Sequence, residues 1–200
     1  MKLNQISQSG RSMVEMLGVL AIIGVLSVGG IAGYTSAMSK WRQNKLIDQV
    51  VVMIAGIRTL YGNSPNYEGI DTAVIANAGI VDQQMLDTNA SGVPNGKIKN
   101  VYNGMVYVKT GFYQRSNDSF WITIAGLPFN ACVTLATTNW GADSGSGLLR
   151  IAANSANTTG IVASGISVIG SMDDNNLSVS PATASAACNG ISNFVALQFQ

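Results

Sequence analysis

Few side chains in this sequence of 200 residues could take part in catalysis or metal binding. Histidine is absent, which removes the most frequent general base and the most frequent metal ligand. The notable residues are Gly10, the carboxylate Glu15 at the start of an apolar segment, and the cysteines Cys132 and Cys188. They point to three kinds of chemistry, which are cleavage of a leader segment, burial of a charge among apolar groups and formation of a disulfide.

The segment that follows Glu15 is long enough to cross a bilayer. No Asp, Glu, Lys or Arg occurs from Met16 to Ser39. At a rise of ~1.5 Å per residue, a helix over this run is roughly 36 Å long, and the hydrocarbon layer is ~30 Å thick. An unpaired charge buried at the start of this helix would cost at least several kcal/mol. We therefore expect Glu15 to have a partner.

The position of Gly10 distinguishes this N-terminus from an ordinary secretory signal, in which the small-residue cleavage site follows the apolar core. Here Gly10 precedes the apolar run, so cleavage after it would leave the apolar helix on the mature protein. The stretch from Gly10 to Ser27 (GRSMVEMLGVLAIIGVLS) closely resembles the class III signal of type IV pilins.

This resemblance implies a role for three residues. A prepilin peptidase would cut between Gly10 and Arg11, the new first residue would be N-methylated, and Glu15 would be the carboxylate that drives subunit docking. The first mature residue of the family is usually apolar, so Arg11 departs from the pattern and its methylation is left open.

Cys132 and Cys188 are the only cysteines. In an exported domain, an even number of cysteines favours a disulfide, which would stabilise the fold by about 4 kcal/mol in the chain-entropy model. The alternative is two buried free thiols. A metal site is less favoured, because the two cysteines are far apart in the sequence and no histidine accompanies them.

Composition indicates an exported protein without catalytic chemistry. Charged residues make up 10% of the chain and the net charge is +1, so there is no basic field for nucleic acid. The Gly- and Ser-rich stretch from Gly141 to Gly147 fits neither a nucleophile elbow nor a phosphate-binding loop. We predict no enzymatic activity, no cofactor and no metal.

Hydrophobic periodicity predicts one helix from Ser12 to Tyr61, ended by the turn residues from Gly62 to Pro65. Its first half is apolar on all sides. Its second half has an apolar stripe on one side, formed by Leu46, Ile47, Val50, Ile54, Ile57 and Tyr61. The first half must therefore be surrounded by lipid or by other helices, whereas the second half lies against its own domain.

The remaining chain has the pattern of an α+β domain with an antiparallel sheet packed on the long helix. Helices are expected at 73–76 after the cap Asp71, at 130–138, and at 182–187 after Ser180 and Pro181. The expected strands are Val101–Lys109, Ser119–Ala125, Leu148–Ala153, Ile161–Ile169 and Phe194–Phe199.

The resemblance extends into this domain. The segments Phe129–Asn139, Asn44–Gly69 and Pro181–Cys188 are similar to bundle-forming pilins of the type IVb subclass. The resemblance implies a pilin fold in which the cysteines close a variable C-terminal region and the last strand, Asn193–Phe199, lies inside the sheet. It divides the chain into a leader (1–10), a long helix (11–62, with 11–39 as the membrane or filament-core half) and a globular head (63–200).

The expected function is that of a major structural subunit of a type IVb-like pilus. Its expected partners are identical subunits, the prepilin peptidase, the inner-membrane assembly machinery and an outer-membrane secretin. The subunit would wait in the bacterial inner membrane as a single-pass protein and then enter an extracellular fibre. The alternatives are a minor pilin or secretion pseudopilin, and a membrane-anchored adhesin that does not polymerise.

Overall fold

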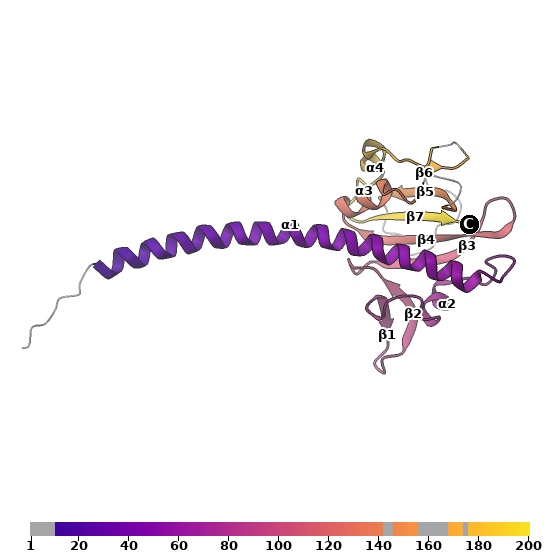
Figure 1. The fold of residues 1–200 in the computed structure, drawn as a ribbon, viewed down its shortest axis with the longest axis horizontal. Coiled ribbons are helices and arrows are strands. Elements are labelled where there is room, and N and C mark those ends of the chain that lie inside the picture. Colours follow the sequence, from indigo (N-terminus) through magenta and orange to yellow (C-terminus); the bar gives the residue numbers. More distant parts are fainter. Residues whose placement is uncertain (1–10, 142–145, 156–167, 174–175) are drawn as a thin grey trace, which may run out of the picture. The chain divides into compact units, whose positions relative to one another are not determined.

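The computed structural model describes residues 11–141, 146–155, 168–173 and 176–200 of the chain, with side chains from residue 13 onward (Figure 1). The chain divides into two compact units, Met1–Trp41 and Arg42–Gln200. The predicted strand over 161–169 and the predicted loop over 141–147 lie largely outside the described residues.

Helix α1 (Arg11–Tyr61) is 51 residues long and contributes to both units. No proline interrupts it, and it ends where Gly62 and Pro65 follow, with the amide of Ser64 donating to the carbonyl of Tyr61 at 2.9 Å. In the second unit the helix buries one stripe of side chains: Leu46, Val50, Met53, Ile54 and Ile57. The predicted helix is confirmed to within one residue at its start.

The described residues of the second unit form one antiparallel sheet of seven strands in the order β1-β2-β3-β4-β7-β5-β6. The strands are β1 (Leu86–Thr88), β2 (Pro94–Lys99), β3 (Met105–Phe112), β4 (Ser116–Leu127), β5 (Leu148–Asn154), β6 (Val168–Ser171) and β7 (Asn193–Phe199). The last strand, β7, pairs with β4 on one side and with β5 on the other, as the family resemblance implies. The fold is therefore the expected α+β arrangement.

Strands β4 and β7 form the centre of the hydrophobic core. Phe120 pairs with Phe199, and Ile122 pairs with Leu197, so alternate residues of both strands project to the same face. These four side chains are at most 2% exposed and belong to the same buried cluster as the stripe of α1. Packing the amphipathic half of α1 on this face gives the layered order of helix on sheet.

The described part of this unit also contains three short helices, and two of them have the side-chain caps that the sequence predicts. In α2 (Thr72–Asn77) the Asp71 carboxylate accepts from the amide of Ala73 at 2.9 Å. In α4 (Pro181–Ala187) the Ser180 hydroxyl accepts from the amide of Thr183 at 3.1 Å. The third is α3 (Phe129–Thr137). A 3-10 turn, Gln83–Met85, precedes β1.

The structure corrects the prediction at the start of the sheet. Strands β1 and β2 were not expected, because β2 contains Pro94 and Gly96, which are rare in strands, and Ile98 as its only fully buried residue. The predicted strand Val101–Lys109 begins too early, since β3 starts only at Met105.

The side chain of Asn100 explains this late start. Its carbonyl oxygen accepts from the amides of Tyr102 and Gly104, and its amide group donates to the carbonyl of Ala125 at 2.8 Å. Asn103 takes a positive φ of 63° within the same turn. The apolar pair Val101 and Tyr102 therefore lies in a turn built by an asparagine rather than in a strand.

Gly104 is required where this turn meets the end of β4. A Cβ on Gly104 would overlap the backbone carbonyl of Ala125, which cannot rotate away.

We predict that Gly104→Ala lowers the free energy of unfolding by about 3 kcal/mol, measured by denaturant unfolding of the full-length chain in detergent. Gly92→Ala is the control, because no atom lies within 4 Å of its Cβ and only its φ of 76° is strained, at a cost of about 1 kcal/mol. Equal losses in the two variants would contradict the close-approach argument.

Candidate functional site

In the described part of the chain, most apolar side chains of the first unit are exposed. Apart from Met38, which is half-buried, its large apolar side chains are more than half exposed, from 52% for Ile23 to 75% for Val25. Among the described residues, α1 is the one helix long and apolar enough to cross a membrane, although a signal sequence would pass the same test. Water is an unfavourable surrounding for such a surface, so lipid or other protein must cover it.

Glu15 is the only charged residue among the described side chains from 13 to 39. It lies one turn into α1, is exposed, and forms no ion pair with another described side chain. Arg11 is the first residue of the helix, and Gly10 lies outside the described residues. The structure does not bring these residues together with a partner, so the roles of Gly10, Arg11 and Glu15 stay predictions.

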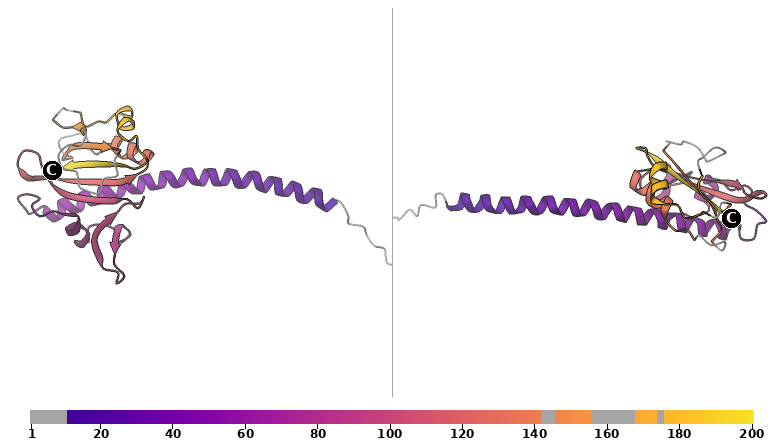
Figure 2. Two further views of the ribbon diagram at one scale, coloured as in Figure 1. Left: turned by 180° about the vertical axis from the view of Figure 1, so that it is seen from behind. Right: turned by 90° about the horizontal axis from the view of Figure 1, so that it is seen from above.

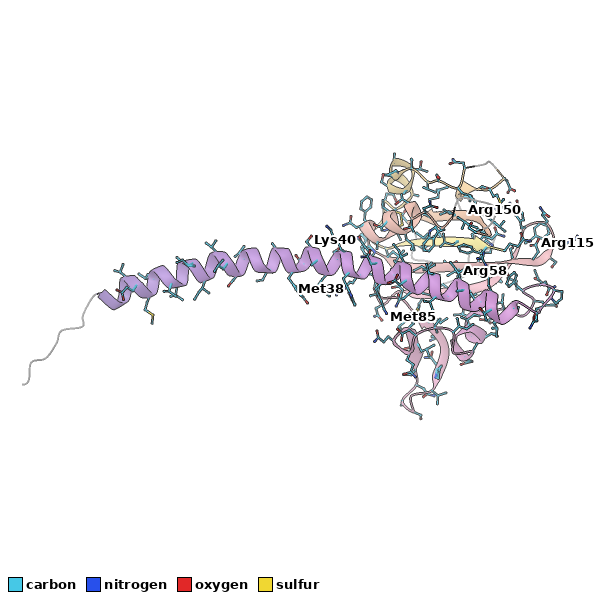
Figure 3. The ribbon with its side chains drawn as sticks, viewed as in Figure 1. Met38, Lys40, Arg58, Met85, Arg115 and Arg150 are labelled. Atoms are coloured by element: carbon cyan, nitrogen blue, oxygen red, sulfur yellow. A yellow bond between two sulfur atoms is a disulfide. The ribbon has the colours of Figure 1, made fainter. Side chains whose placement is uncertain are left out.

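Arg58 fixes the end of α1 to the end of the sheet. Its guanidinium donates to the carbonyl of Ser146 at 2.6 Å and to that of Gln200 at 2.9 Å, and it lies 5.4 Å from the ring centre of Phe199. The sequence analysis did not predict this contact. Arg58 follows directly after Ile57 of the apolar stripe, and a cation at such a position could have indicated a contact with the head. Figure 3 labels Arg58 on α1 beside the central strands.

A second anchor holds α1 near Gly56. A Cβ on Gly56 would overlap the side chain of Ile80, which follows α2, so the glycine provides the notch that receives this side chain. Close by, Lys45 of α1 forms an ion pair of 3.5 Å with Asp82. The segment between α2 and β1 is therefore attached to the helix by both an apolar and a charged contact.

Cys132 and Cys188 are joined in a disulfide, which confirms the predicted pairing and overturns the alternative of two free thiols. Cys132 lies in α3 and Cys188 follows the last residue of α4, and neither is exposed to solvent. The bond spans a sequence separation of 56 residues and fastens α4 to α3, which pack on each other. It therefore closes the C-terminal region that contains β5 and β6.

No set of three or more His, Cys, Asp or Glu side chains able to hold a metal ion occurs in the part of the chain that the structure describes. A hollow of about 400 Å³ lies where α1 ends and is lined by Arg58, Tyr61, Tyr67, Arg115 and Asp118 among others. Burial raises the pKa of the Tyr67 hydroxyl, and the charge of Arg58 beside it partly opposes this shift. A raised pKa keeps this tyrosine protonated, so it can donate a hydrogen bond but is a poor general base.

Asp118 organises the hairpin between β3 and β4. Its carboxylate accepts from the amides of Tyr113, Gln114 and Arg115 at 2.7 to 2.8 Å. Burial alone would raise the pKa of Asp118, but these hydrogen bonds outweigh burial and lower it below the ordinary value of 3.8. The charged form of Asp118 therefore stabilises the folded hairpin.

Comparison with solved structures assigns the fold to a class. The chain matches a type IV b pilin from Salmonella typhi with a TM-score of 0.50 and 18% identity, over 77% of this chain and 96% of that one. It matches the type IV pilin TcpA from Vibrio cholerae El Tor with a TM-score of 0.50 and 18% identity, over 80% of this chain and 99% of that one. The long helix, the antiparallel sheet and the C-terminal disulfide thus form a type IVb pilin fold.

The family follows from the sequence match. Residues 35–193 match the family model Bundlin, and the chain belongs to this family. It is 28% identical over 141 residues to the protein named major structural subunit of bundle-forming pilus from Escherichia coli O127:H6, with 70% of this chain and 69% of that protein covered. A relative of the same name from Escherichia coli O111:H- matches equally well. The family is one of pilin structural subunits, which are not known as enzymes.

The lowered pKa of Asp118 gives a pH prediction. The carboxylate stabilises the fold above pH 3.8, and this contribution is lost as the pH falls through the lower pKa of the folded state. Asp118→Asn should lower the free energy of unfolding by about 1 kcal/mol near neutral pH, because the group is partly exposed. The difference from the wild type should shrink below pH 3.8. Asp48→Asn, at an exposed position of α1, is the control. A difference that stays constant down to strongly acidic pH would contradict the carboxylate's role.

Removing the disulfide should destabilise the head. Because the bond closes a loop with a separation of 56 residues, we predict that Cys132→Ala together with Cys188→Ala lowers the free energy of unfolding by about 4 kcal/mol. A reductant should destabilise the wild type and leave the double variant unchanged. Free thiols recovered from freshly isolated and alkylated surface protein would show that the bond does not form in the cell.

Proposed function

We propose that this chain is the major structural subunit of a type IVb-like pilus and that it polymerises through the apolar half of α1. The observation that carries this proposal is the exposed apolar surface from residue 13 to 41 in a member of the Bundlin family. The proposed division is a leader at 1–10, a long helix at 11–62 whose residues 11–39 enter the membrane or filament core, and a head at 63–200.

The driving force for polymerisation is burial of this apolar half among the same segments of neighbouring subunits. Before assembly, lipid covers the helix, and after assembly other helices replace the lipid. The contacts between subunits are heterologous, so they do not close into a ring and generate a fibre. Between helices in lipid, close packing rather than hydrophobicity favours association, and Gly18, Gly24 and Gly29 permit close approach.

Glu15 supplies the directional element in this packing. In a bundle of apolar helices an unpaired carboxylate is strongly disfavoured, and the positive group able to offset it is the α-amine of Arg11 that cleavage after Gly10 exposes. Pairing with the amine of a neighbouring subunit would set the axial register, because a misaligned helix would leave both charges unpaired. The guanidinium of Arg11 adds a second positive charge at this position.

The proposal includes the route to the fibre. The prepilin peptidase cleaves the leader, the subunit remains in the inner membrane through α1, and the assembly machinery and an outer-membrane secretin deliver it to the surface. The function is structural, with no enzymatic activity, cofactor or nucleic acid partner. A minor pilin, a secretion pseudopilin or a non-polymerising adhesin is less favoured, because both relatives are named major structural subunits. Mass spectrometry of sheared surface fibres tests this directly, since a major subunit must be their bulk protein.

Replacement of Glu15 tests the docking role. We predict that cells expressing only Glu15→Ala contain inserted, cleaved and disulfide-bonded subunits but form no pili, as counted by electron microscopy. Glu68→Ala is the matched control, because it removes an exposed carboxylate from the head and should leave pili at wild-type numbers. If Glu15 acted only on the helix dipole, worth ~0.3–1 kcal/mol, fibres would persist.

The same cells test the processing step. Intact-mass analysis should give a mature N-terminus at Arg11 in the wild type and in both variants. A subunit that begins at Met1, or one cut beyond Ser27, would overturn the class III signal. Wild-type numbers of normal pili from Glu15→Ala cells would overturn the docking role alone.

A further inference from the structure

Among the described residues, three loops at one end of the head contain no charged residue. They are 100–104 between β2 and β3, 125–130 from the end of β4 to the start of α3, and 189–193 from the residues after α4 to the first residue of β7. Hydrogen bonds join them: Asn100 donates to Ala125 at 2.8 Å, and Asn193 donates to Leu127 at 3.2 Å. We call this surface, formed by the three loops, the neutral end.

The neutral end is where α1 enters the second unit. The amide of Val101 donates to the side-chain oxygen of Gln49 at 3.2 Å, and the charge of Arg42 acts on the hydroxyl of Tyr102. At the opposite end of the sheet, Arg58 donates to the carbonyl of Gln200. Helix α1 from residue 42 and strand β7 therefore run in the same direction, which Figures 1 and 2 also show for this unit.

The neutral end exposes two large apolar side chains. Ile191 is fully exposed, at 103% of its reference area, and Phe129 is 46% exposed. No charged residue occurs in the sequence from 119 to 141 or from 176 to 200, so α3, α4 and β7 add none. The charges that α1 contributes nearby are Arg42, Lys45 and Asp48, of which Lys45 is paired with Asp82. Lys99, at the end of β2, is paired with Asp87 at 2.8 Å.

We propose that the neutral end docks on the phospholipid head groups of the membrane that holds the apolar half of α1 before assembly. This inference rests on the proposed insertion of residues 16–39. Only Lys40 and Trp41 separate Ser39 from Arg42, so the start of the head unit follows the uncharged run by roughly 5 Å along the helix. The turn that contains Tyr102, beside Arg42, is therefore connected to the uncharged run by only a few residues of helix.

The chemistry of the neutral end fits a lipid surface. Isoleucine and phenylalanine side chains partition into the boundary between head groups and acyl chains, and here no charged group in the loops has to be desolvated with them. Arg42 adds attraction to anionic phospholipids, and Trp41 is of the type enriched at membrane interfaces. Two apolar side chains give a weak and reversible contact, which suits a subunit that must later leave the membrane.

Photo-cross-linking tests the contact. The full-length chain, with p-benzoylphenylalanine replacing Ile191 or Phe129, is reconstituted at low density into vesicles of phosphatidylethanolamine and phosphatidylglycerol. We expect lipid adducts by mass spectrometry from both positions. The control replaces Arg115, an exposed residue in the hairpin at the opposite end of the sheet, and should give none.

Carbonate extraction of the same vesicles, which reports whether the chain is inserted, distinguishes a failure of the docking inference from a failure of the proposed function. An inserted chain without lipid adducts at 191 and 129, or with adducts only to another protein chain, overturns the inference and leaves the proposed function standing. A chain that is not inserted overturns both.

Ile191→Asp, with the cross-linker at 129, should lose the lipid adduct, whereas Ile191→Leu should keep it. Because Ile191 is fully exposed, neither substitution should disturb the fold, which the intact disulfide reports. Adducts that survive Ile191→Asp would show that the surface does not act as one apolar contact.

Discussion

The structure depends on one helix that has to suit two surroundings, the core of its own head along one part and lipid or other protein along the rest. Helix α1 buries its own apolar side chains only from Leu46 onward, where the sheet covers one stripe of it. From Met13 to Leu26 its large apolar side chains are exposed over more than half of their area. The same backbone therefore serves as a core helix of a globular domain and as a surface that other molecules must cover.

This constraint explains how the head is attached. Because α1 continues beyond the head, any pull on the apolar half is transmitted to the stripe of α1 and to the contacts that hold it. Those contacts occur at both ends of the sheet, with Gln49 bonded to the turn after β2 and Arg58 bonded to the residue after β7. Strand β7 is buried along its whole length between β4 and β5, so the helix is fastened to the most protected strand of the sheet.

The sequence predicted those elements whose signals are local. The caps Asp71 and Ser180, the proline-free helix and the apolar strands β4, β5 and β7 each have a pattern that needs no knowledge of the rest of the fold. Strand β2 could not be predicted in this way, because its register depends on pairing with β3 and not on its own residues. The position of β7 inside the sheet came only from the family resemblance. At the candidate site, Glu15 and the cysteines stand out by type and spacing, whereas Arg58 has a role only through a contact 142 residues away.

The placement of Glu15 at the start of the apolar run is consistent with the proposed assembly. Apolar burial is not directional, so a seam made only of aliphatic side chains would tolerate sliding of one helix along another. In the proposed assembly a single charge would remove this freedom, because only one register would give the carboxylate a positive partner. A charge in the middle of the segment would also oppose insertion, since it would lie at the centre of the bilayer. At the first turns of the helix, the carboxylate can stay hydrated at the membrane surface until a neighbouring subunit replaces the water. One residue can thereby give register to the fibre without excluding the subunit from the membrane.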